Sequence, residues 1–194
     1  LPGLAIQHLI VERRHAWMDE GFNTFLNFYS GLDFYDGTLQ TGMQRYAQLV
    51  VRTMQSPIAD QPILTYADRI RPQGLGFLAY RKPAAGLILL REYVLGPERF
   101  DAAFRAYIDR WAYKHPKPAD FFRTMEDVSG ETLDWFWRGW FYSTATLDQV
   151  VTDVQPGSRS EPTRITIAHR NDLMLPVEMR ITFADGSTEQ RRIP

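Results

Sequence analysis

The residues of this sequence best suited to chemistry lie in one short stretch, residues 17–25, which reads W-M-D-E-G-F-N-T-F. Apolar residues recur from Phe22 to Tyr29 at the spacing of one helical face. The pattern predicts a buried helix that carries the Glu20 carboxylate inward. An unpaired buried charge is too costly, so this carboxylate must be paired or bind a metal. A helix-start acid that only interacts with the helix dipole is the structural alternative.

Two further groups of residues have weaker patterns. His8, Glu12 and His15 are spaced i, i+4 and i+7 and could share a helical face, but a partly exposed polar face explains them better than a metal site. The tryptophans of residues 135–140 could form a platform on which a ligand stacks. An aromatic stripe at helical spacing is more often core, and we favour that interpretation.

The stretch around Glu20 resembles the W-x-x-E-G-F signature of the M1 aminopeptidases, zinc enzymes of the gluzincin group. The resemblance implies that Glu20 is the third ligand of one zinc ion, completing a His2Glu set with water in the fourth position. The expected substrates are peptides with a free N-terminus, from which N-terminal residues are hydrolysed. The resemblance covers Glu12 to Thr144 well and the segment after it only by position.

Residues 79–86, A-Y-R-K-P-A-A-G, resemble the Y-x-K-G-A element of the same family. The resemblance implies that Tyr80 donates a hydrogen bond to the oxyanion of the tetrahedral intermediate. A phenol with a pKa of ~10 stays protonated at neutral pH and can donate. Taken alone, Tyr80 would be a core residue of an apolar helix. Pro83 replaces the usual Gly of the family. Lys82 lies about 200° round the helix from Tyr80, so the two side chains do not share a face. We therefore expect Lys82 to form a buried ion pair rather than to take part in catalysis.

The family's H-E-x-x-H helix, with eighteen residues between its second His and the zinc-binding Glu, has no counterpart in the sequence. Counting back from Glu20 reaches Leu1, and none of the four histidines is followed by Glu. The resemblance thus implies that the missing ligands belong to an upstream part of the same catalytic domain. The chain alone is expected to bind zinc poorly and to be inactive. The alternative is a non-catalytic M1-like scaffold or interaction domain that has lost the zinc site.

The order of patterns predicts a mainly α fold. Helical patterns fill residues 1–144, and the resemblance identifies this part as the C-terminal helical bundle of a thermolysin-like M1 catalytic domain. Residues 145–194 are expected to form a small, incomplete β-sandwich, with turns at 155–157, 170–172 and 185–186 separating its strands. Ser30-Gly31 is expected to end the Glu20 helix. Residues 75–95 are apolar nearly all round, as in a helix from the middle of a bundle.

Composition excludes several classes of protein. The 194 residues are 44% hydrophobic and carry a net charge of -1, so there is no basic excess for binding nucleic acid. Cysteine is absent, which excludes disulfides, cysteine zinc sites and a cysteine nucleophile. No apolar run approaches the ~20 residues that span a bilayer. The sequence does not indicate a compartment.

Overall fold

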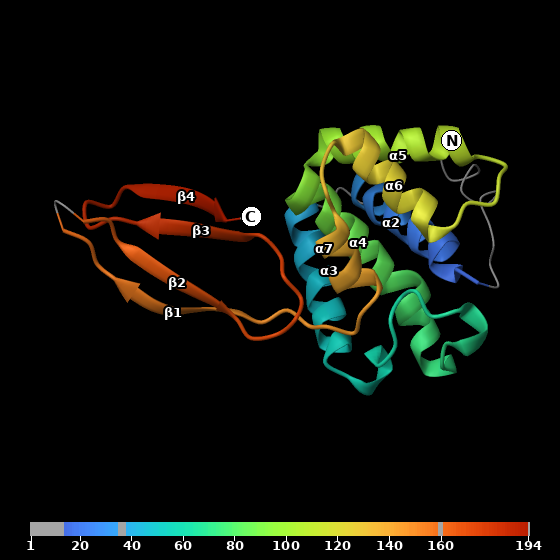
Figure 1. Cartoon of the computed structure of the whole chain (residues 1–194), viewed down its shortest axis with the longest axis horizontal. Helices are drawn as coiled ribbons and strands as arrows, with labels where there is room; N and C mark the ends of the chain where they lie inside the picture. The colour runs from blue at the N-terminus through green and yellow to red at the C-terminus, as the bar shows by residue number, and fades with distance from the viewer. Residues whose placement is uncertain (1–13, 35–37, 159–160, 194) are drawn as a thin grey trace. The chain divides into compact units, whose positions relative to one another are not determined.

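The structure is a computed structural model that describes residues 14–34, 38–158 and 161–193. The chain divides after Thr144 into a helical unit and a β unit. The predicted fold class, a mainly helical chain with a small β appendage, is confirmed (Figure 1). Leu1 to Val11 and the predicted polar face of His8 and Glu12 lie outside the described residues.

The helical unit consists of α-helices joined by short 3-10 and π turns. The α-helices are α2 (Ala16–Phe34), α3 (Leu39–Met54), α4 (Lys82–Leu89), α5 (Pro97–Trp111), α6 (Pro118–Ser129) and α7 (Asp134–Phe136). The π turns are η4 (Gly76–Arg81), η5 (Leu90–Leu95) and η6 (Trp137–Phe141). The connector between α3 and η4 holds the 3-10 turns η1 (Pro57–Ala59), η2 (Ala67–Arg69) and η3 (Pro72–Gly74). No described helix is long and apolar enough to cross a membrane.

Local sequence explains three of the helix ends. The Thr38 side chain accepts a hydrogen bond from the Thr41 amide and caps α3. Gly96 has a φ of 82° and precedes Pro97, the first residue of α5. Gly130 ends α6 in the left-handed conformation.

The predicted end of the Glu20 helix at Ser30-Gly31 is wrong, because α2 continues to Phe34. A Cβ atom built on Gly42 of α3 would lie 2.6 Å from the Leu32 side chain and 3.4 Å from the Phe28 ring. The last turns of α2 therefore pack closely on α3. This tertiary contact outweighs the weak helix propensity of Gly31.

The core of the helical unit is aromatic. The rings of Trp17 and Phe22, on α2, lie 6.1 and 5.0 Å from that of Phe121 on α6. Helix α4 lies in the middle of the unit beside α2 and α3 (Figure 1), and seven of its eight residues are buried. The prediction of a central apolar helix is confirmed. Pro83 lies in the first turn of α4, directly after the π-helical segment η4.

The β unit contains two antiparallel hairpins. The predicted strands form as β1 (Gln149–Gln155), β2 (Arg164–His169), β3 (Val177–Thr182) and β4 (Thr188–Ile193). Strands β1 and β2 pair from Gln149↔His169 to Gln155↔Arg164, with a bulge between Val151 and Asp153. Strands β3 and β4 form a separate sheet.

Candidate active site

A cavity of about 220 Å³ brings the two predicted site residues together. Glu20 lies on α2 and Tyr80 on η4, sixty residues further along the chain. The cavity is lined by Ala16, Asp19, Glu20, Leu75, Ala79 and Tyr80. The Glu20 carboxylate and the Tyr80 phenol thus line the same cavity, which is formed by α2 and the segment around η4.

Burial of the flanking aromatic residues holds Glu20 in place. Trp17 and Phe22 are 1% and 0% exposed, whereas Glu20 between them is half-buried. The two rings therefore anchor this stretch of α2 in the core and leave the Glu20 side chain at the cavity. The carboxylate is less deeply buried than the sequence predicts.

Gly21 allows α2 to approach the Tyr80 segment closely. A Cβ atom at this position would lie 2.8 Å from both Cβ and Cγ of Pro83 and 3.3 Å from the Ala79 carbonyl oxygen. Any larger residue would push the two helices apart. The glycine that follows Glu20 therefore sets the separation between Glu20 and Tyr80.

Pro83 shapes the turn that carries Tyr80. Proline has no amide hydrogen, so the Ala79 carbonyl loses its α-helical donor four residues on. Just before it, the Lys82 amide donates to the Phe77 carbonyl, five residues back, as in a π-helix. Pro83, at which the sequence departs from the family pattern, thus takes part in forming the site.

Electrostatics couple the Tyr80 hydroxyl to Glu20. Their hydrogen-bond interaction, burial and the charges of Glu20 and Asp19 raise the pKa of Tyr80 to about 12. Tyr80 is 36% exposed and keeps its proton at neutral pH. Asp19, which accepts a hydrogen bond of 2.8 Å from Asn23, is a member of the site that sequence reasoning missed. Its position next to Glu20 was the signal that could have revealed it.

Lys82 does not form the expected ion pair among the described residues. Its side chain is 1% exposed, and its ammonium donates to the Ser143 carbonyl oxygen at 3.0 Å. Burial lowers the pKa of Lys82 to about 8. The expectation was wrong about the partner because a backbone carbonyl freed at a helix end satisfies the ammonium.

The described residues do not form a metal site by themselves. No group of three or more His, Asp or Glu side chains in the described ranges is placed to hold an ion. His15 packs edge-on against Tyr66 at 5.8 Å, and burial, with the charge of Arg14, lowers its pKa. Glu20 has the chemistry of a single zinc ligand, and a complete set needs donors beyond the described residues.

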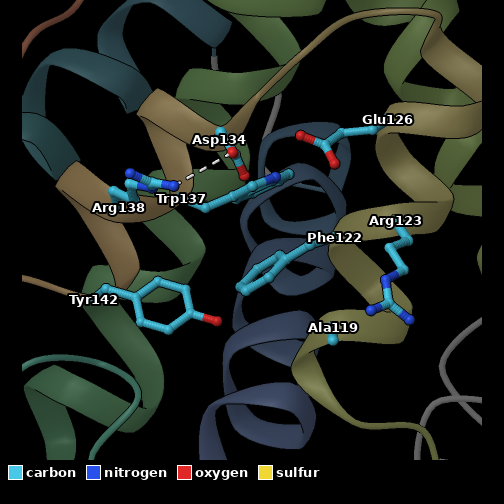
Figure 2. A pocket seen from close by; sticks show the side chains of 8 residues that line it. All are labelled: Ala119, Phe122, Arg123, Glu126, Asp134, Trp137, Arg138 and Tyr142. Atoms are coloured by element: carbon cyan, nitrogen blue, oxygen red, sulfur yellow. Dashed lines mark ion pairs between the residues drawn. The ribbon is translucent and has the colours of Figure 1, made fainter.

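A second cavity, of about 450 Å³, lies between α6 and the α7–η6 segment (Figure 2). Charged side chains surround it, including the Arg138–Asp134 pair at 3.6 Å. Trp137 is 2% exposed and stacks on Phe122 at 4.4 Å. Trp140 is also buried, so Trp137 and Trp140 are core residues as favoured, whereas Trp135 is 36% exposed.

Comparison with known proteins places the chain in a family. The Peptidase family M1 domain matches residues 11–140, a range that includes both Glu20 and Tyr80. The chain belongs to the peptidase M1 family.

Relatives of this M1 chain are aminopeptidases. Aminopeptidase M1-A of Oryza sativa subsp. japonica is 27% identical over 130 residues, which cover 65% of this chain and 14% of that protein. Glutamyl aminopeptidase of Homo sapiens is 26% identical over 143 residues, 69% of this chain and 15% of that protein. The M1 chain thus spans about one seventh of the length of these relatives.

A solved structure shares the fold of the M1 chain. The crystal structure of Legionella pneumophila aminopeptidase A in complex with aspartic acid matches 92% of this chain and 20% of that one. Its TM-score is 0.58 and its sequence identity is 14%. At this identity, the likeness shows the fold alone.

Proposed function

We propose that the helical unit supplies part of the active site of a zinc aminopeptidase. Glu20 is the third ligand of one zinc ion, and Tyr80 is the hydrogen-bond donor to the oxyanion. The observation that carries the proposal is the cavity shared by these two residues, each within its own M1-like motif. The relatives' names add support for an aminopeptidase activity.

Each of the two residues has the chemistry that its role requires. A zinc ion, when bound, activates water and polarises the scissile carbonyl. The Glu20 carboxylate is half-buried at the cavity and supplies an anionic oxygen ligand. The pKa of the Tyr80 hydroxyl is raised to about 12, so it retains its proton well above neutral pH. It can therefore donate to a developing negative charge without losing its proton at neutral pH.

The proposed substrates are peptides with a free N-terminus. The two histidine ligands and the group that holds the substrate's amino terminus would come from an upstream part of the same catalytic domain. The 194-residue chain alone is proposed to bind zinc weakly and to have no aminopeptidase activity.

The test begins with the coding sequence directly upstream of the Leu1 codon. We expect it to encode an H-E-x-x-H motif whose second histidine lies next to Leu1. The protein expressed with that segment should contain one zinc ion per chain and cleave N-terminal residues. Absence of the motif would overturn the enzyme proposal in favour of a non-catalytic M1-like scaffold.

Two substitutions in that longer protein separate the roles. Glu20→Ala should abolish both the zinc content and the activity. Tyr80→Phe should keep the zinc and lower kcat by about 10²–10³, the cost of removing one oxyanion donor. Tyr142→Phe is the matched control, since this exposed tyrosine lines the other cavity and should leave kcat unchanged.

A further inference from the structure

We propose that Lys82 is a positioning residue that holds Tyr80 against Glu20. The inference rests on the proposed role of Tyr80 but needs neither zinc nor activity for its test. Tyr80 is 36% exposed, so packing around its own ring restrains it only partly. The position of its hydroxyl therefore depends on the backbone turn that carries it.

Lys82 ties this turn to the end of η6 through both its side chain and its backbone. The buried ammonium donates to the Ser143 carbonyl oxygen at 3.0 Å, and the Lys82 carbonyl accepts from the Trp140 indole at 2.8 Å. The Lys82 amide closes the π turn on Phe77. A single residue, two positions after Tyr80, thus makes three hydrogen bonds that set the geometry of the turn.

The surroundings of Lys82 leave these bonds little freedom. A Cβ atom on Gly86, one turn along α4, would lie 2.5 Å from Nε1 of Trp140. The indole of Trp140 therefore packs closely on α4, and its N–H group donates to the Lys82 carbonyl. Trp140 is 4% exposed, so water cannot readily replace this bond. The contact fixes α4 against η6.

The backbone just after Tyr80 also accepts hydrogen bonds from outside its own helix. The Arg81 carbonyl accepts from the Tyr46 hydroxyl of α3 at 3.0 Å, and the Lys82 carbonyl from Trp140. Two successive carbonyls after Tyr80 are thus held by side chains from two other elements. The Lys82 side chain adds its bond to Ser143, and we call these three hydrogen bonds, made by Tyr46, Trp140 and Lys82, the clamp.

The experiment measures the Tyr80 ring by NMR in the 194-residue chain with isotope-labelled tyrosine, at neutral pH and without metal. The Glu20→Ala variant supplies the signal of Tyr80 without its partner. In Lys82→Met we expect the Tyr80 signal to move most of the way toward that reference and its ring order parameter to fall. The buried Tyr107 ring should stay unchanged.

Two further variants make the outcome decisive. Trp140→Phe keeps a ring over Gly86 and removes only the donor to Lys82, so it should move the Tyr80 signal in the same direction even if Lys82→Met does not fold. Phe100→Leu destabilises the core away from the clamp and should leave Tyr80 in place. An unchanged Tyr80 signal in Trp140→Phe, or an equal shift in Phe100→Leu, would overturn the proposal. An unchanged Tyr80 signal in Glu20→Ala would instead show that Tyr80 and Glu20 do not interact, which would contradict the proposed function.

Discussion

At the scale of single residues, the site depends on one acid beside one phenol. The hydrogen-bond interaction with Glu20 is the largest cause of the raised Tyr80 pKa, followed by burial and then by the charges of Glu20 and Asp19. Because this pKa lies well above neutral pH, the Tyr80 hydroxyl remains protonated and can donate a hydrogen bond. This protonation state is consistent with the proposed role of Tyr80 as a hydrogen-bond donor rather than a base.

We expect Glu20→Gln to lower the Tyr80 pKa from about 12 toward its ordinary value of 10.0. The amide removes the negative charge and weakens the acceptor, so less free energy opposes ionisation of the phenol. The pKa can be measured by following the Tyr80 ring carbon signal with rising pH. Asp19→Asn is the control and should lower the pKa less, because Asp19 acts only through its charge. Equal shifts in the two variants would contradict this ranking.

At the scale of elements, the close packing of α2 on α4 sets the distance between Glu20 and Tyr80. We expect Gly21→Ala to destabilise the helical unit by about 1–3 kcal/mol, since the new methyl group would lie 2.8 Å from Pro83. Gly31→Ala, in the same helix with no atom within 4 Å of its Cβ position, should stabilise by about 0.5–1 kcal/mol. Thermal unfolding of both variants checks the opposite signs, and destabilisation by both would disprove the packing argument.

Lys82, at the junction of η4 and α4, gives the helical unit a pH dependence of defined sign. Burial lowers its pKa from 10.5 to about 8, so the unfolded chain binds more protons between these values. Stability should therefore rise with pH above about 8, and this gain is absent at lower pH. Denaturant unfolding from pH 7.5 to 9.5 measures the slope. Lys82→Met should flatten it, and an unchanged slope in that variant would assign the dependence to another group.

At the scale of the whole molecule, the two units differ in how much apolar surface they bury. The helical unit has an extensive aromatic core, whereas Leu173 is the sole buried residue among those described in the β unit. Two-stranded hairpins are marginally stable on their own. We expect amides of β1 to β4 to exchange with solvent faster than those of α4, α5 and α6. Hydrogen-exchange mass spectrometry tests this, and equal protection of the two units would contradict it.

Prediction from sequence succeeded where short-range patterns determine structure. The apolar spacing of residues 75–95 indicated a central helix, and the turn residues around 185–186 separated β3 from β4. The predicted end of α2 was wrong, because packing of α2 against Gly42 outweighs the weak helix propensity of Gly31. The predicted ion pair of Lys82 was also wrong, because its ammonium donates to the distant Ser143 carbonyl. These failures share a cause, since each depends on a contact with a residue remote in the chain.

The sequence by itself determined which residues could do the chemistry, because W-x-x-E-G-F and the tyrosine motif are local patterns of residue type. It also determined the division between helices and strands, through periodicity and turn residues. Only the tertiary structure decided that Glu20 and Tyr80 share a cavity, that Gly21 packs on Pro83, and that Lys82 is bound to η6. Such pairings depend on how helices separated by many residues pack together, and side-chain volume and hydrogen-bond satisfaction across the whole core set that packing.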